Sequence, residues 1–118
     1  MIKFVQCVRR KSGLSKQEFR EQWTEYGQEV KAIANASKAT RCVLSTALMV
    51  DQNMNIMQTR GTKAPYDGMA EVWWERGADV VAFLESGAAD ALLENMRRTQ
   101  EAIMDLSNCT FFFASEDA

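Results

Sequence analysis

The sequence contains no histidine and only three cysteines among its 118 residues. Without histidine, haem ligation by that residue is impossible, and so is any Ser-His-Asp or Cys-His catalytic arrangement. The cysteines, Cys7, Cys42 and Cys109, lie far apart, and no pair has the CxxC spacing of a zinc site. We therefore expect no disulfide framework, no metal and no bound cofactor.

Runs of basic and of apolar residues are also missing. The 14 Lys and Arg against 16 Asp and Glu give a net charge of −2, and no basic cluster occurs, which argues against nucleic acid as a partner. No apolar stretch approaches the roughly 20 residues that span a bilayer. The N-terminal MIKFVQCVRRKSG lacks the apolar segment of a signal peptide. We expect a cytoplasmic protein without a membrane partner.

The residues that are present have the balance of a globular protein. Hydrophobic residues make up 47% of the chain and charged residues 25%. A chain of this length can build one hydrophobic core but has little material for a second. We expect one domain over residues 1–118.

The clearest local pattern is a helix start in LSKQEF, residues 14–19. Ser15 is the expected N-cap, Glu18 completes a capping box, and Leu14 with Phe19 forms a hydrophobic staple. Apolar residues then recur at helical spacing and predict one interior face: Phe19, Trp23, Tyr26, Val30 and Ile33. Four glutamates follow the same spacing on another face and predict a solvated surface: Glu18, Glu21, Glu25 and Glu29.

The rest of the chain predicts four strands and two more helices. The strands, rich in β-branched and aromatic residues, are expected at 2–10, 41–50, 67–75 and 109–115. Helices are expected at 78–86 and 88–106, and residues 51–65 are interpreted as a long loop, a type that often forms a lid. The order β-α-β-β-α-β predicts an α+β fold with a four-stranded antiparallel sheet and the helices on one face.

Both faces of this sheet carry apolar residues. The third strand alternates Ala70, Val72 and Trp74 on one face with Met69 and Trp73 on the other. Helices can cover only one face, so the second needs another cover. A second copy of the sheet is the simplest one, and we expect a homodimer.

Three segments resemble the EthD domain family. They are LSKQEFREQW (14–23), YDGMAEVWW (66–74) and MDLSNCTFFF (104–113), and the middle one is the most specific. The resemblance implies a ferredoxin-like fold that dimerises sheet to sheet as a dimeric α+β barrel. It also implies a cavity in each subunit, between the helices and the sheet, that accepts small hydrophobic molecules.

The resemblance leaves the activity open. Relatives with this barrel include cofactor-independent monooxygenases, aromatic polyketide cyclases and decarboxylases, and muconolactone isomerases. Many members of the family carry a histidine four residues after the helix tryptophan, where this chain has Gly27. One hypothesis is an enzyme that acts on a hydrophobic aromatic or lactone-like metabolite by cofactor-independent isomerisation, cyclisation, decarboxylation or oxygenation. The alternatives are a non-catalytic binding or accessory protein that has lost the histidine, or a structural protein whose cavity is filled.

Six residues are candidates for the cavity. Tyr26 is the candidate catalytic residue: its ordinary pKa of about 10 makes it a poor base, but its hydroxyl can donate a hydrogen bond to a carbonyl or enolate. The candidate ligand-binding residues are Gln6, Trp23, Gly27, Tyr66 and Trp74. Trp23 fits plain core packing as well. Glu71 is expected on the opposite face of the sheet, paired with Arg9 or Arg41.

Overall fold

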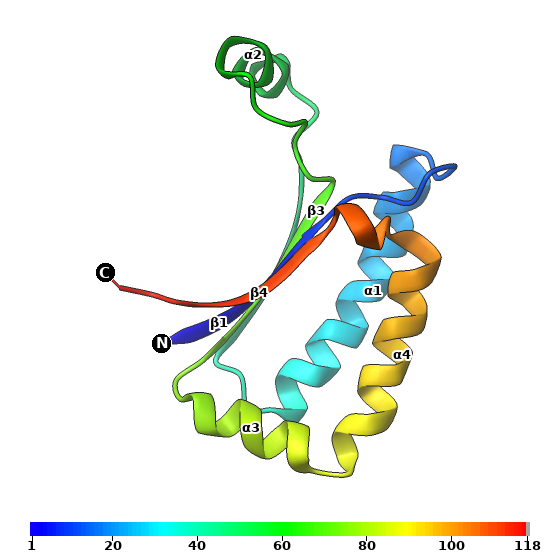
Figure 1. The fold of residues 1–118 in the computed structure, drawn as a ribbon. Coiled ribbons are helices and arrows are strands. Elements are labelled where there is room, and N and C mark those ends of the chain that lie inside the picture. Colours follow the sequence, from blue (N-terminus) through cyan, green and yellow to red (C-terminus); the bar gives the residue numbers. More distant parts are fainter. Residues whose placement is uncertain (118) are drawn as a thin grey trace.

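A computed structural model describes residues 1–117 and shows one antiparallel sheet with helices packed on one face (Figure 1). The strands are β1 (Ile2–Val8), β2 (Arg41–Thr46), β3 (Gly68–Trp74) and β4 (Thr110–Ser115). The helices are α1 (Lys16–Ala36), α2 (Asp51–Arg60), α3 (Gly77–Glu85), α4 (Ala88–Ile103) and the 3₁₀ turn η1 (Leu106–Asn108). The strand order β2-β3-β1-β4 with antiparallel pairing is that of a ferredoxin-like fold, which confirms the predicted class.

Helix α1 begins as its sequence predicts. The Ser15 hydroxyl accepts a hydrogen bond from the Glu18 amide at 3.0 Å, and the Glu18 carboxylate accepts one from the Ser15 amide at 3.1 Å. These two bonds satisfy amides that the first turn of a helix leaves without partners. The interior face is also confirmed for its first four members, whereas Ile33 is half-buried and Ala34 is buried in its place.

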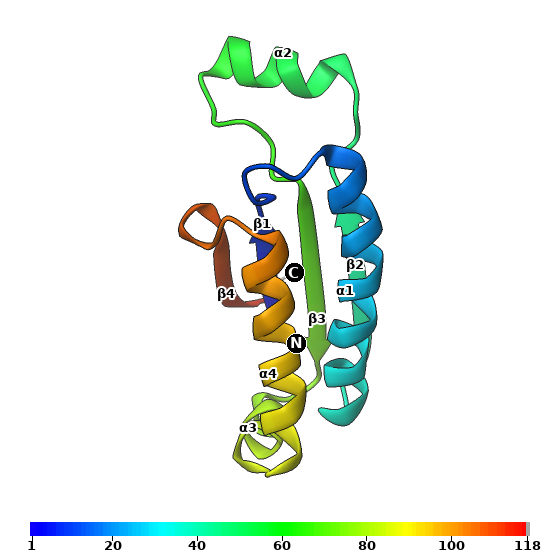
Figure 2. The same ribbon diagram turned by 90° about the vertical axis from the view of Figure 1, so that its right-hand side faces the viewer.

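The core lies between the sheet and the pair α1 and α4 (Figures 1 and 2). Buried residues of α1 pack there against the inward face of β3, which carries Ala70, Val72 and Trp74. On the face away from these helices, Met69 is 36% exposed and Phe112 is 44% exposed. The predicted division of the sheet into two apolar faces is therefore present in the structure.

Part of the predicted loop at 51–65 is a helix. Helix α2 ends at Arg60, and the next residue, Gly61, has a φ of +69° and supplies the left-handed cap common at helix ends. It was missed because it has no side-chain N-cap bond and buries none of its residues, so neither an N-capping nor an amphipathic signal marks it. Figure 1 shows α2 beyond the ends of β2 and β3, on the side of the sheet away from α1 and α4.

Three predicted boundaries were too long. The first strand ends at Val8, the second at Thr46, and α4 at Ile103, after which the η1 turn leads into β4. Beyond Thr46 the chain leaves the sheet and leads to α2 (Figure 1).

Candidate functional site

Tyr26 lies at the centre of a buried hydrogen-bond network. Its side chain has no solvent exposure, and its hydroxyl donates to Oε1 of Gln6 at 2.5 Å. The Tyr26 hydroxyl oxygen also accepts a hydrogen bond from Nε2 of Gln100 at 2.9 Å. The network joins α1, β1 and α4. Burial raises the pKa of Tyr26 well above its ordinary value, so the phenol stays protonated and cannot serve as a base near neutral pH.

Gln100 was not singled out from the sequence. It follows Met96 by four residues and precedes Ile103 by three, so helical spacing places it on the inward face of α4. A polar residue at such a position needs a buried partner. That spacing was the available signal.

Trp23 and Gly27 are packed against the sheet. The Trp23 ring stacks between Phe19 and Tyr26, with both centroid distances at 5.3 Å. A Cβ atom at Gly27 would lie 3.1 Å from a methyl carbon of Leu44. The Leu44 side chain therefore occupies the space into which a larger residue at position 27 would extend.

Trp74 is also in the interior. It is 4% exposed, and its indole N–H donates to the hydroxyl of Ser37 at 3.0 Å. Glu71 lies on the opposite face of the sheet and forms an ion pair with Lys3 at 3.0 Å, rather than with either of the two arginines expected.

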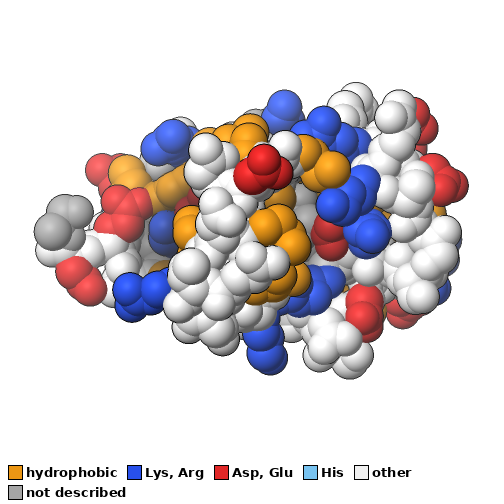
Figure 3. Space-filling view, turned by 90° about the horizontal axis from the view of Figure 1, so that it is seen from above, with side chains coloured by type: hydrophobic (Ala, Val, Ile, Leu, Met, Phe, Trp, Pro, Cys, Tyr) orange, Lys and Arg blue, Asp and Glu red, His pale blue; other side chains and the backbone are white. Residues whose placement is uncertain are grey.

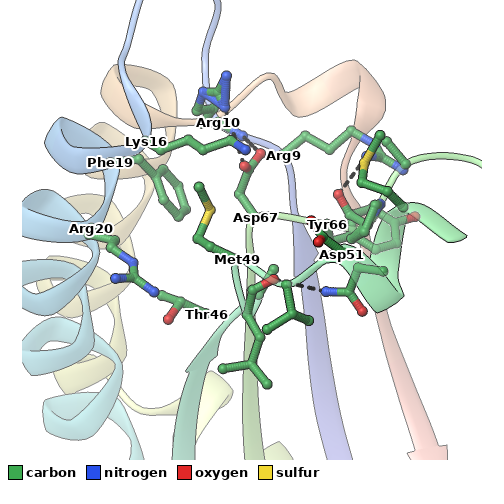
Figure 4. Close-up of a pocket in the computed structure, with 17 residues that line it drawn as sticks. Arg9, Arg10, Lys16, Phe19, Arg20, Thr46, Met49, Asp51, Tyr66 and Asp67 are labelled. Carbon is green, nitrogen blue, oxygen red and sulfur yellow. Dashed lines mark hydrogen bonds and ion pairs between the residues drawn. The ribbon is translucent and has the colours of Figure 1, made fainter.

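A pocket of about 490 Å³ lies at the end of the molecule near α2 (Figure 4). It is bordered by the beginning of α1, the segment that follows β1, and the connection between β2 and β3, residues 47–67, which carries α2 and which we call the α2 arm. Its apolar lining includes Phe19, Leu48, Met49, Met54, Pro65 and Tyr66. Its charged lining consists of Arg9, Arg10, Lys16, Arg20, Asp51 and Asp67. Its size lies in the range of small-molecule sites, about 300 to 1,000 Å³.

Two arginines after β1 hold the part of the pocket wall that is formed by the segment before β3. The Arg10 amide donates to Asp67 at 2.8 Å, and its guanidinium forms an ion pair with the same carboxylate at 3.4 Å. The Arg9 guanidinium lies 4.3 Å from the centre of the Tyr66 ring and donates to the Pro65 carbonyl at 3.2 Å. These contacts hold Tyr66 and Asp67 in the pocket wall.

Of the six predicted site residues, Tyr66 lines this pocket. The structure brings Tyr26 and Gln6 together, but neither they nor Trp23, Gly27 and Trp74 line it. Their roles toward a ligand stay predictions. The basic lining was missed, although Lys16 and Arg20, four residues apart in the first turns of a predicted helix, were visible as neighbours on one helical face.

Residues 1–117 contain no group of three or more Cys, Asp or Glu side chains that could hold a metal ion. Among the helices of this range, none combines the length and the hydropathy needed to cross a bilayer.

Comparisons with known proteins place the chain in a family. Solved structures similar to it include a dimeric protein of unknown function and ferredoxin-like fold from Bacteroides fragilis, with a TM-score of 0.62 at 7% identity, covering 98% of this chain and 95% of that one. A dimeric ferredoxin-like protein of unknown function from Thermobifida fusca has a TM-score of 0.61 at 9% identity, with 98% and 90% covered.

An uncharacterised NIPSNAP domain protein from Burkholderia xenovorans has a TM-score of 0.57 at 13% identity, with 100% and 96% covered. These identities establish a shared fold alone. Comparison with curated protein sequences gives no match. The family model described as the EthD domain, however, matches residues 11–98, which is most of the chain. The protein therefore belongs to the EthD domain family.

Proposed function

We propose that this protein binds a small, largely apolar molecule in the pocket beside α2. The observation that carries the proposal is the combination of a cavity of about 490 Å³ with an apolar lining and a few charged groups. Ligand sites typically combine an apolar wall with a small number of polar groups that orient the ligand. Methionines in the lining suit such a site because their unbranched side chains adapt to different shapes.

Binding is favoured over catalysis by the state of the candidate catalytic group. General acid–base catalysis works best with a group whose pKa is near the working pH. Tyr26 has a raised pKa and is fully engaged by two glutamines, and the chain contains no histidine. Cofactor-independent isomerisation, cyclisation, decarboxylation or oxygenation of an aromatic or lactone-like metabolite stays the alternative. In that case the substrate itself would supply most of the reactivity.

Methyl NMR tests the proposal. Met49 and Met54 line the pocket, whereas Met96 packs against the core and is the control probe. A panel of small aromatic acids, amides and lactones should contain compounds that shift the two pocket methyl signals in a saturable way and leave Met96 unchanged. A panel without any such compound would contradict the proposal. Product formation from a bound compound would favour the enzyme over the binding protein.

We also propose that the protein is a homodimer formed through the open face of the sheet. Met69 and Phe112 are exposed there, and α2 extends over the same side (Figure 1). Exposed apolar side chains on one face are typical of protein–protein contacts. The dimeric descriptions of two structural neighbours support this arrangement.

Location in the cytoplasm stays a prediction from the sequence.

A further inference from the structure

We propose that the pocket selects an anion, namely a small apolar molecule that carries a carboxylate, and that Lys16 and Arg20 bind this carboxylate. The inference rests on the proposed function, because it names the class of molecule for the same pocket. Figure 3 views the molecule from the α2 end and shows hydrophobic side chains beside the arm with Lys and Arg side chains next to them.

The charges of the lining do not balance. Four basic side chains and two acidic ones face the pocket. Arg10 is neutralised by Asp67, and Arg9 is held against the Tyr66 ring and the Pro65 carbonyl. These two arginines build the wall, so the groups left to meet a ligand are those on α1.

Lys16 and Arg20 do not make comparable contacts with the pocket wall. They are four residues apart, about 6 Å along the helix axis, and therefore lie on one side of α1. Figure 4 shows both side chains extending from α1 toward the pocket, with Arg20 directed to Thr46. Neither side chain takes part in any ion pair among residues 1–117. The remaining carboxylate of the lining, Asp51, lies across the pocket at the start of α2.

The chemistry of this pair suits a carboxylate on an apolar body. Ammonium and guanidinium groups form short, charge-assisted hydrogen bonds to carboxylate oxygens, and these bonds are stronger than neutral ones. Met49 lies beside the two cations (Figure 4). Met49 and Leu48, which are 66% and 70% exposed, offer an apolar surface for a ring. A neutral molecule of the same shape would cover this surface but leave both cations without a partner.

The experiment compares 2-naphthoate with 2-naphthamide, which have the same ring system and differ in charge. Both are titrated into the full chain while the methyl signals of Met49 and Met54 are followed. We expect naphthoate to bind more tightly by about tenfold, the effect of one charge-assisted hydrogen bond. The preference should shrink as salt is raised, because salt screens exposed charges.

Two variants assign the preference to residues. The double substitution Lys16→Gln and Arg20→Gln should remove the preference for naphthoate and leave naphthamide binding unchanged. Both residues are exposed, so the variant should keep its fold, which circular dichroism verifies. Lys31→Gln is the matched control, because Lys31 is an exposed cation of α1 outside the pocket, and it should keep the full preference.

The outcomes separate this inference from the proposed function. Equal binding of the two probes, or a preference that survives the double substitution, overturns the carboxylate inference and leaves the pocket as a small-molecule site. If neither probe nor any member of the wider panel shifts the pocket methyls, both proposals fail.

Discussion

At the residue scale, Tyr26 has a role in the fold beside its predicted role toward a ligand. Its phenol connects a strand amide and a helix amide, and all three side chains are buried. A buried amide costs free energy unless it is hydrogen-bonded, so each member of this network satisfies another. Burial raises the pKa of Tyr26, so the phenol does not act as a general base near neutral pH.

Tyr26→Phe should lower the free energy of unfolding by about 1 to 3 kcal/mol, because Gln6 and Gln100 would each lose a partner inside the core. Urea unfolding followed by tryptophan fluorescence measures the change. Tyr66→Phe is the control, since the Tyr66 hydroxyl has only an exposed contact with Thr110, at 3.3 Å, to lose. Equal stability of the Tyr26 variant and the wild type would show that the network contributes nothing.

Glu18 gives a prediction about acid. Hydrogen bonds from the amide and the hydroxyl of Ser15 lower the pKa of Glu18, so folding favours its ionised form. The resulting stabilisation is complete above the ordinary pKa of about 4.3 and is lost as pH falls through the lower folded-state value. Glu18→Gln should therefore be less stable than wild type at pH 7 and should lose this difference in acid. Glu25→Gln is the control for the loss of a carboxylate from an exposed position of the same helix.

At the scale of elements, the contact of α1 with β3 depends on a missing side chain. A Cβ atom at Gly68 would lie 2.9 Å from two ring carbons of Trp23, closer than real Cβ atoms approach. The ring cannot move easily, because it is stacked between two other aromatic rings. Gly68 thus sets how closely the helix approaches the sheet.

Gly68→Ala should destabilise the fold by about 1 to 3 kcal/mol, the usual cost of overpacking a core. Gly87→Ala is the control, because a Cβ there meets no atom within 4 Å. Thermal and urea denaturation of the two variants provide the comparison. A Gly68 variant as stable as the Gly87 variant would mean that Trp23 can shift at little cost.

At the scale of the whole molecule, the sheet face that no helix covers and the α2 arm lie on the same side (Figure 1). Helix α2 buries none of its residues against its own chain, and its apolar residues Met54 and Ile56 are 48% and 54% exposed. A short helix with so little packing is marginal by itself. A partner subunit on the open face would lie beneath this arm and could cover it.

Phe112→Arg should convert the dimer to a monomer, because it places a charge in the proposed interface on a side chain that the monomer leaves 44% exposed. Sedimentation at micromolar concentration should give twice the chain mass for wild type and the single mass for the variant. Val81→Arg makes the same kind of change at an exposed position of α3 and should stay dimeric. A wild-type protein that sediments as a monomer would refute the interface.

The sequence alone determined the features that depend on short-range patterns. The capping box at Ser15 and Glu18 joins residues three apart, and the interior face of α1 follows from a period of 3.6 residues. Strand alternation likewise showed that Met69 and Trp73 lie opposite Ala70 and Val72. These patterns fixed the fold class and the family motifs, because each can be read within a few consecutive residues.

Only the tertiary structure decided where the pocket lies and which polar groups meet. Tyr26 bonds to partners 20 and 74 residues away, and Arg10 pairs with a carboxylate 57 residues away. Helix α2 has no side-chain N-cap and no buried side, so no amphipathic pattern predicted the arm that borders the pocket. The space beside Gly27 depended on Leu44, a residue of another element. Such contacts arise from how the elements pack together, and the spacing of residues along one element carries no information about them.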